Sequence, residues 1–278
     1  MFSILGRTMA RVIPLICIDV DGTLVGSSGE VTAAVWNAAE AATARGQHLA
    51  LCTARGAFGS TLPMAQRLDP QGWHVFHAGG AIVHAEHLTV RGHGFDDEQI
   101  VAAGELAREH GWVIEFYTAA DYTVDDDSAM AVEHAALMGV PFTQRIRDEL
   151  PKGDPIVRMQ FVVPVDEARS VVSLAEEAGM TATAATSPIM RDAAFVSLTL
   201  PGVTKATGIE SIAAELGVSL ADVMMVGDGL NDLPAIEAVG HPVAMANAQP
   251  EVLAAAAHVV GHVDNDGLVE ALELAAQL

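Results

Sequence analysis

Short apolar runs alternate with alanine-rich segments at both ends of the chain. The run at residues 12–18 has the length and branched composition of a strand that is buried on both faces. Shorter or similar runs lie at 48–52, 75–76, 81–83, 223–226, 243–245 and 259–260. Segments with helical composition lie between them, at 31–45, 57–68, 205–216, 233–238, 250–256 and 267–276. This alternation predicts a parallel sheet with helices on both faces.

The middle of the chain has a different pattern. Two strand-like runs, at 113–117 and 156–163, each carry one polar and one apolar face. The polar faces consist of Glu115, Tyr117, Arg158 and Gln160. Helical segments accompany these runs at 97–110, 128–138 and 165–178. Because one face of each strand is polar, we expect an open-faced sheet with helices on one side.

These two patterns divide the chain into domains. We predict an α/β fold with a discontinuous, Rossmann-like core over residues 12–84 and 191–278. The run at 196–200 is assigned to this core because it has the same apolar composition as the other core strands. Residues 85–190 form a separate inserted α+β domain. Residues 1–11 are interpreted as a loose extension, and Met9 is an alternative start of translation.

Charge and composition narrow the classes of partner. The 278 residues include 36 acids and 14 bases, which gives a formal net charge of −22. Such a chain has no basic surface for nucleic acid or for an anionic membrane. It also has no apolar segment of the roughly 18 residues that a membrane helix needs. We expect a cytoplasmic protein, as a monomer or homodimer, with Cys17 and Cys52 as reduced thiols in buried strands.

Polar clusters follow three of the predicted buried strands. Asp19 and Asp21 follow the first, Thr53 follows the second, and Asp228, Asn231 and Asp232 follow the run at 223–226. Ligands of open parallel sheets bind at the carboxyl ends of the strands, so we expect these clusters to converge. Carboxylate ligands without histidine or cysteine favour Mg²⁺. Lys205, at the start of a predicted helix, adds a cation, and together these groups indicate a phosphate site.

Each of these residues alone has a simpler interpretation. Thr53 alone fits a polar strand end, Lys205 an exposed helix residue, and Asp228 and Asp232 a turn or a helix cap. Together, however, each of these residue types occurs at the strand end or helix start where a phosphate site needs it, and this joint order favours the phosphate site. A dinucleotide site at Gly227 fails because position 232 is aspartate and not a third glycine. His74, His77, His84, His87 and His93 are interpreted as surface or turn residues, since no carboxylate or cysteine pattern supports a second metal site.

The motifs resemble those of the haloacid dehalogenase superfamily of phosphatases, in its Cof-like branch with a type IIB cap. The resemblance covers residues 12–275 and rests on Asp19-Val20-Asp21-Gly22-Thr23, on Thr53, on Lys205 and on the segment Gly227–Asp232. The length of the insert between Thr53 and Lys205 also fits a type IIB cap. One departure is Gly79-Gly80-Ala81, where many relatives have Asn-Gly-Ala.

The resemblance implies a role for each motif residue. Asp19 would be the nucleophile, which forms an aspartyl-phosphate, and Asp21 the general acid and base. Mg²⁺ would be held by Asp19, the Asp21 backbone carbonyl and Asp228, with Asp232 in support. Gly22, Thr53, Lys205 and Asn231 would bind the phosphoryl oxygens.

These assignments predict a Mg²⁺-dependent phosphomonoesterase of small phosphorylated metabolites, such as sugar phosphates or cofactor phosphates. Glu115, Tyr117, Arg158 and Gln160 are candidates for substrate contacts, and the alternative for them is a solvated sheet face. Two other functions stay open. A phosphosugar mutase would need a cap that binds a second phosphate, for which this cap has few basic residues. A non-catalytic regulatory protein would have no use for both Asp19 and Asp21.

Overall fold

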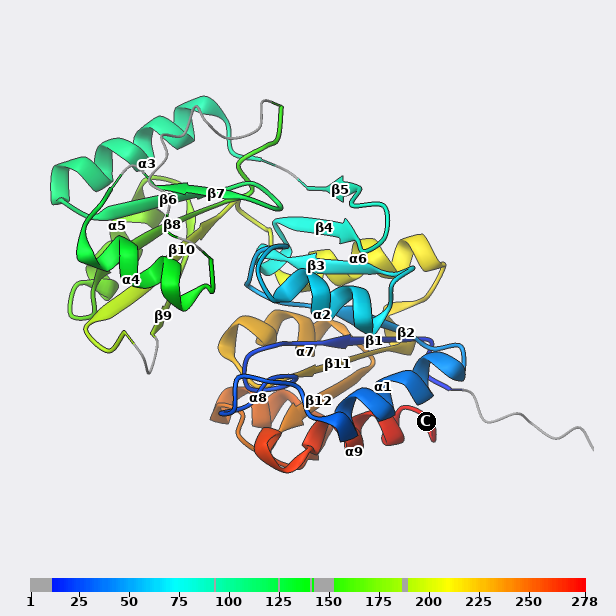
Figure 1. Ribbon diagram of the computed structural model, residues 1–278. Helices are drawn as coiled ribbons and strands as arrows, with labels where there is room; N and C mark the ends of the chain where they lie inside the picture. Colours follow the sequence, from blue (N-terminus) through cyan, green and yellow to red (C-terminus); the bar gives the residue numbers. More distant parts are fainter. Residues whose placement is uncertain (1–11, 93, 125, 141, 143–152, 187–189) are drawn as a thin grey trace, which may run out of the picture. The chain divides into compact units, whose positions relative to one another are not determined.

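The computed structural model describes residues 12–92, 94–124, 126–140, 142, 153–186 and 190–278 (Figure 1). Contacts between residues divide the chain into two units. Unit 1 combines the N-terminal segment up to Leu51 with Glu210–Leu278, and unit 2 consists of Cys52–Ile209. The extension predicted at 1–11 lies outside the described residues. No helix in the described parts of the chain has the length and apolarity to span a membrane.

Unit 1 contains the predicted parallel sheet. Its strands are β1 (Leu15–Ile18), β2 (His48–Leu51), β11 (Val223–Gly227), β12 (His241–Met245) and β13 (His258–Val260). They lie in the order β13-β12-β11-β1-β2, and all four pairings are parallel. Every residue of β1 and β11 is buried, as expected for central strands with both faces covered. The sheet prediction is therefore confirmed for these five strands.

Helices of unit 1 begin and end close to the predicted positions. They are α1 (Ala33–Ala44), α7 (Leu233–Ala238), α8 (Pro250–Ala255) and α9 (Gly267–Leu274), with short 3₁₀ turns η3 (Leu220–Asp222), η4 (Leu230–Asp232) and η5 (Val263–Asn265). The Thr32 hydroxyl accepts a hydrogen bond from Val35 N and so caps α1. Figure 1 shows α1 beside α9. The boundary between the units falls within α6 (Lys205–Leu216).

Unit 2 begins with a small antiparallel sheet. It consists of β3 (Trp73–Phe76), β4 (Ala81–His84) and β5 (Val90–Arg91), with η1 (His77–Gly79) between the first two strands and α2 (Thr61–Leu68) before them. The expected strands at 75–76 and 81–83 therefore exist, but β3 pairs with β4 in antiparallel fashion. His74 is fully buried in β3, so its interpretation as a surface or turn residue is wrong. His77 has no exposed surface either, but it lies in the turn η1, as one of the two interpretations predicted.

The larger sheet of unit 2 is antiparallel, with the order β7-β6-β8-β10-β9. Its strands are β7 (Tyr122–Val124), β6 (Val113–Tyr117), β8 (Arg158–Pro164), β10 (Ala193–Thr199) and β9 (Thr181–Thr186). Helices α3 (Asp97–His110) and α5 (Ala168–Glu177) pack on one face through an apolar core that includes Ile100, Val171, Phe161 and Val196. Helix α4 (Ala129–Leu137) packs on the other face, against Tyr117, Val162 and Phe195.

Two details of the predicted insert need correction. The run assigned to the core at 196–200 belongs to β10, which pairs with β8 and β9 in the insert sheet. Its composition resembles that of a core strand because helices cover both of its faces. The polar face expected to be free is also covered, since Glu115, Tyr117, Arg158 and Gln160 are all buried. The predicted cap, 85–190, lies within unit 2, and its boundaries stay a prediction.

Candidate active site

Asp19 occupies the first position after β1, where the parallel sheet ends. Ile18 is in register with Val226 of β11, and Asp19 N donates a hydrogen bond to Val226 O at 3.0 Å. The chain then turns back on itself, since Val25 N donates to Val20 O at 2.8 Å and Gly22 N to Val25 O at 2.9 Å. Only 5% of Asp19 is exposed. A buried carboxylate at this position is costly unless a cation or hydrogen-bond donors offset its charge.

Asp228 lies opposite this turn, directly after β11. The Thr23 hydroxyl donates to Asp228 Oδ1 at 3.2 Å, and the Asn247 side-chain amide donates to Asp228 Oδ2 at 3.4 Å. Gly22 packs against the same carboxylate with φ +85°, and a Cβ atom there would collide with Asp228 Oδ2. Position 22 therefore favours glycine for two reasons: its backbone is left-handed, and the Asp228 carboxylate approaches it closely.

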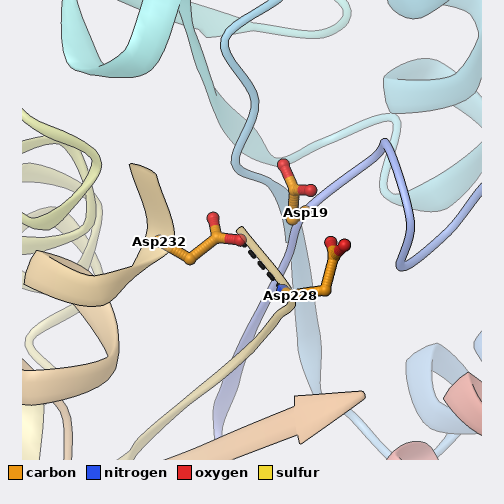
Figure 2. A group of neighbouring side chains, drawn as sticks. All are labelled: Asp19, Asp228 and Asp232. Carbon is orange, nitrogen blue, oxygen red and sulfur yellow. Dashed lines mark hydrogen bonds between the residues drawn. The ribbon is translucent and has the colours of Figure 1, made fainter. Parts of the chain in front are cut away.

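Asp232 shapes the turn that carries Asp228. Its Oδ2 atom accepts a hydrogen bond from Asp228 N at 3.0 Å (Figure 2) and a second from Gly229 N, also at 3.0 Å. Asp232 has no exposed surface. The two backbone donors stabilise the negative charge of Asp232 and fix the direction in which Asp228 leaves the strand. Asp232 thus acts on Asp228 through the backbone amides of Asp228 and Gly229, to which it is hydrogen-bonded.

Asp19, Asp228 and Asp232 together form a carboxylate cluster. One oxygen atom from each can be chosen so that all three lie within 4.8 Å of one another (Figure 2). Three carboxylates this close repel one another unless a cation is present. Opposite ligands of an octahedral Mg²⁺ lie about 4.2 Å apart, which follows from metal–oxygen distances of roughly 2.1 Å. The oxygen-only donor set and its spacing fit a hard divalent cation.

The other predicted residues of unit 1 lie at the surface. Asp21 and Asn231 are exposed, Asp21 in the turn after β1 and Asn231 in η4. The Asp21 carboxylate is not a member of the cluster of three, and the contact of its backbone carbonyl with a metal ion stays a prediction. An exposed carboxylate can exchange protons with solvent and with a bound substrate, as a general acid and base must.

Thr53 and Lys205 belong to unit 2, where both are buried. Ala78 N donates to Thr53 O at 2.9 Å, and Thr53 Oγ1 accepts from Arg55 N at 3.1 Å. The next residue, Gly79, packs against the backbone of Thr204, where a Cβ atom at Gly79 would collide with Thr204 O. The turn after β3 therefore joins the Thr53 loop to the first turn of α6, which begins at Lys205.

This connecting turn has an unusual backbone. His77, Ala78 and Gly79 have φ values of 52°, 54° and 109°, all in or near the left-handed region. Such conformations cost free energy in residues other than glycine, so surrounding contacts must hold them. His77 N donates to Arg55 O at 2.9 Å, and His77 Nε2 donates to Ala119 O at 3.2 Å. Burial, helped by the nearby charge of Arg158, lowers the pKa of His77 to about 3 and keeps the ring neutral.

The four candidate substrate residues of the insert form a buried network with α4. Glu115 accepts from Tyr117 Oη at 2.5 Å and from Gln160 Nε2 at 3.0 Å, and its other oxygen lies 2.7 Å from His134 Nδ1. Arg158 lies over the Tyr117 ring at 4.1 Å and donates to Ala54 O at 2.8 Å. Burial and the Glu115 charge raise the pKa of Tyr117 well above its ordinary value. Their role as substrate contacts stays a prediction.

Two residues of the site escaped the sequence analysis. Thr23 was named in the motif without a role, and it binds the Asp228 carboxylate. Asn247, which follows β12, was not noticed, although its amide donates to Gly22 O at 2.8 Å. Its signal was available in principle, because a polar residue after a buried strand of the same parallel sheet falls at the same edge as Asp19.

Comparison with known proteins identifies the family. Residues 16–272 match the family of haloacid dehalogenase-like hydrolases. The chain belongs to this family. It is 34% identical over 251 residues to a Bacillus subtilis (strain 168) protein named "Putative phosphatase YxeH". The aligned region covers 87% of this chain and 90% of that protein. The resemblance inferred from the motifs is thus confirmed.

Solved structures agree with this assignment. BT1666 of Bacteroides thetaiotaomicron, described among phosphatases of the superfamily, is 25% identical, covers 99% of this chain and 98% of its own, and has a TM-score of 0.80. The subclass IIB sugar phosphatase BT4131 is 23% identical, covers 95% and 99%, and shares the fold with a TM-score of 0.78. The family and these relatives make the chain an enzyme of the phosphatase type.

Proposed function

We propose that this protein is a Mg²⁺-dependent phosphomonoesterase that hydrolyses small phosphorylated metabolites through an aspartyl-phosphate on Asp19. The observation that supports this most strongly is the cluster of Asp19, Asp228 and Asp232 after neighbouring parallel strands. Asp19 is the member that the motif marks as the nucleophile, and it is buried at the sheet edge. The name of the subclass IIB relative favours sugar phosphates among the possible substrates.

Each residue has a defined task in the proposed reaction. A carboxylate oxygen of Asp19 attacks phosphorus, and the bond from phosphorus to the leaving oxygen breaks. Asp21 donates a proton to that leaving oxygen, then removes a proton from the water that attacks the phosphorylated Asp19. Inorganic phosphate leaves and Asp19 is regenerated. Bound Mg²⁺ would supply positive charge that offsets the repulsion between the carboxylates and the phosphate.

The remaining motif residues would bind the phosphoryl group. Gly22 would contribute its backbone amide, and Thr53, Lys205 and Asn231 their side chains. This assignment comes from the resemblance, and the joint action of residues from both units is part of the proposal. Within unit 2, the contacts from Thr53 through Ala78 and Gly79 to Thr204 support a common task for Thr53 and Lys205.

Phosphate release from a panel of phosphorylated sugars, nucleotides and cofactors tests the proposal. We expect release by the wild type with Mg²⁺, none with a chelator, and a loss of at least about 10³-fold in Asp19→Asn, since the amide cannot act as a nucleophile. Glu40→Gln, which removes an exposed carboxylate from α1 of the same unit, is the matched control and should keep full activity.

Two results would contradict the proposal. Release that survives in Asp19→Asn would rule out Asp19 as the nucleophile. A folded wild type that releases no phosphate, but converts a hexose 1-phosphate into its 6-phosphate, would identify the mutase instead.

A further inference from the structure

Asn247 is placed where three loops of unit 1 meet. It follows β12, and Val243 and Ala244 of β12 are in register with Val226 and Gly227 of β11. Residues that follow these two strands therefore emerge at the same edge of the sheet, beside the turn that carries Asp228. The Asn247 side chain is partly buried there.

The Asn247 amide uses both of its functional groups. Nδ2 donates to Gly22 O at 2.8 Å and lies 3.4 Å from Asp228 Oδ2, while Oδ1 accepts from Val263 N at 3.0 Å. One side chain thus joins the turn after β1, the carboxylate after β11 and the loop after β13. Only a residue with a donor and an acceptor at this spacing can make all three contacts. Aspartate has the same shape, but it lacks the donor and would repel Asp228.

These contacts orient Asp228 without neutralising it. Thr23 holds one oxygen of the carboxylate and Asn247 the other, so rotation of the carboxylate would break a hydrogen bond on either side. Both donors are uncharged, and each carboxylate oxygen has a second lone pair. The negative charge of Asp228 therefore stays available for a cation. Because the carboxylate is already ordered in the folded protein, binding of a cation does not have to order it.

We propose that Asn247 is a positioning residue that holds the Asp228 carboxylate against the Gly22 turn and thereby sets the affinity of the carboxylate cluster for a divalent cation. This inference rests on the proposed function, because it requires that the cluster of Asp19, Asp228 and Asp232 binds such an ion. Outer contacts of this kind typically contribute 10–100-fold to metal affinity.

Binding of Mn²⁺ to the full chain without substrate tests the inference, with free Mn²⁺ followed by electron paramagnetic resonance and Mg²⁺ as competitor. We expect Asn247→Ala to weaken Mn²⁺ binding about 10-fold or more and Asn247→Asp to weaken it as well, despite its added charge. Asn265→Asp adds the same charge at an exposed position of η5 and serves as the matched control. Its Mn²⁺ affinity should equal that of the wild type.

Steady-state kinetics separate positioning from general damage to the fold. Asn247→Ala should need more Mg²⁺ for half-maximal activity but recover most of its kcat at saturating Mg²⁺, with its thermal midpoint without metal close to that of the wild type. An unchanged Mn²⁺ affinity, or a weaker affinity only together with a large loss of metal-free stability, would overturn the inference. Failure of the proposed function itself would look different, because the wild type would then bind no Mn²⁺ or release no phosphate.

Discussion

At the scale of single residues, two neighbours in the left-handed turn after β3 differ in what limits their side chains. Ala78 has a φ of 54°, a conformation that costs free energy for a residue with a Cβ atom. Gly79 has a φ of 109°, and it also lies against the backbone of Thr204, which leaves no room for a Cβ atom. Both residues belong to the turn that joins the Thr53 loop to the start of α6. Their substitutions separate the effect of backbone conformation from that of close packing.

We predict that Ala78→Gly changes the free energy of unfolding by less than about 1 kcal/mol. Relief of the left-handed strain, worth about 1–2 kcal/mol, is then largely cancelled by the greater freedom of glycine in the unfolded chain. Gly79→Ala, its matched counterpart, should lower the free energy of unfolding by roughly 2 kcal/mol or more, because the new Cβ atom meets Thr204 O. Urea denaturation of both variants measures the difference. Equal effects would show that the turn relaxes freely.

A buried histidine makes the stability of unit 2 depend on pH. Burial lowers the pKa of His74 from 6.5 to about 4, and His74 Nε2 donates to Asp69 O at 3.0 Å. In the unfolded chain the ring takes up a proton as the pH falls below about 6.5. The folded ring stays neutral until about pH 4, so the unfolded state binds more protons between these values. The contribution of His74 to stability is therefore lost as the solution is acidified.

We predict that His74→Gln reduces the loss of stability between pH 6.5 and pH 4.5. One histidine accounts for at most about 1.4 kcal/mol per pH unit in this range. The measurement is the free energy of unfolding in urea at several pH values, with His110→Gln on the exposed side of α3 as the control. Parallel pH curves for the wild type and His74→Gln would show that His74 is also protonated in the folded state.

At the scale of elements, helix α4 and strands β6 and β8 share a polar network inside an apolar layer. Glu115 is the acceptor that Tyr117 and Gln160 have in common, and His134 brings α4 to the same carboxylate. Ser197 of β10 extends the network by donating to Gln160 Oε1 at 3.1 Å. The alignment of α4 on the sheet therefore depends on one buried carboxylate.

We predict that Glu115→Ala lowers the free energy of unfolding by roughly 3–5 kcal/mol, because it leaves several buried donors without their acceptor. Glu115→Gln should cost less, since the amide oxygen can still accept hydrogen bonds. Chemical denaturation measures both, with the exposed Glu109→Ala of α3 as the control. If Glu115→Gln raised KM with an unchanged free energy of unfolding, the predicted substrate contact would be favoured over a structural role.

Most elements could be predicted from the sequence because their signals are local. Helices α3, α6 and α7 have the predicted bounds, and the capping box of Asp96 and Gln99 together with Gly111 shows why for α3. Strand β9 was missed because its threonines and alanines form no apolar run. Strand β10 was placed in the wrong sheet because a strand covered on both faces has the same pattern in either sheet.

The candidate site divides in the same way between local and distant signals. The carboxylates could be predicted because Asp19 and Asp228 come at the ends of apolar runs and Asp232 lies four positions after Asp228. The role of Thr23 could not, since it depends on a contact with a residue 205 positions away. For Asn247 the sequence indicates only a place after a buried strand, and its contact with Gly22, 225 positions away, follows only from the fold. The covering of the polar face by α4 also depends on packing, and a polar side chain looks the same in a sequence whether water or His134 is its partner.

At the scale of the whole molecule, 36 acidic residues face only 14 basic ones, which leaves a net charge of −22. Like charges on the surface repel one another and oppose compact states, and salt screens this repulsion over about 8–10 Å near physiological ionic strength. The same field repels phosphorylated substrates at long range. Binding such anions therefore depends on short-range hydrogen-bond donors and on the cation proposed for the carboxylate cluster, which would reverse the general field locally.

The position of β1 between β2 and β11 also has a consequence for synthesis of the chain. Thr23 and Asp228, which meet across the site, are 205 residues apart. At typical translation rates of about 5–20 residues per second, the ribosome needs roughly 10–40 s to make the intervening chain. During this time β1 has no β11 beside it, and its apolar edge is open to wrong partners or to a chaperone. The carboxylate cluster is thus assembled late in the life of the nascent chain, and a product that stops before Asp228 cannot form it.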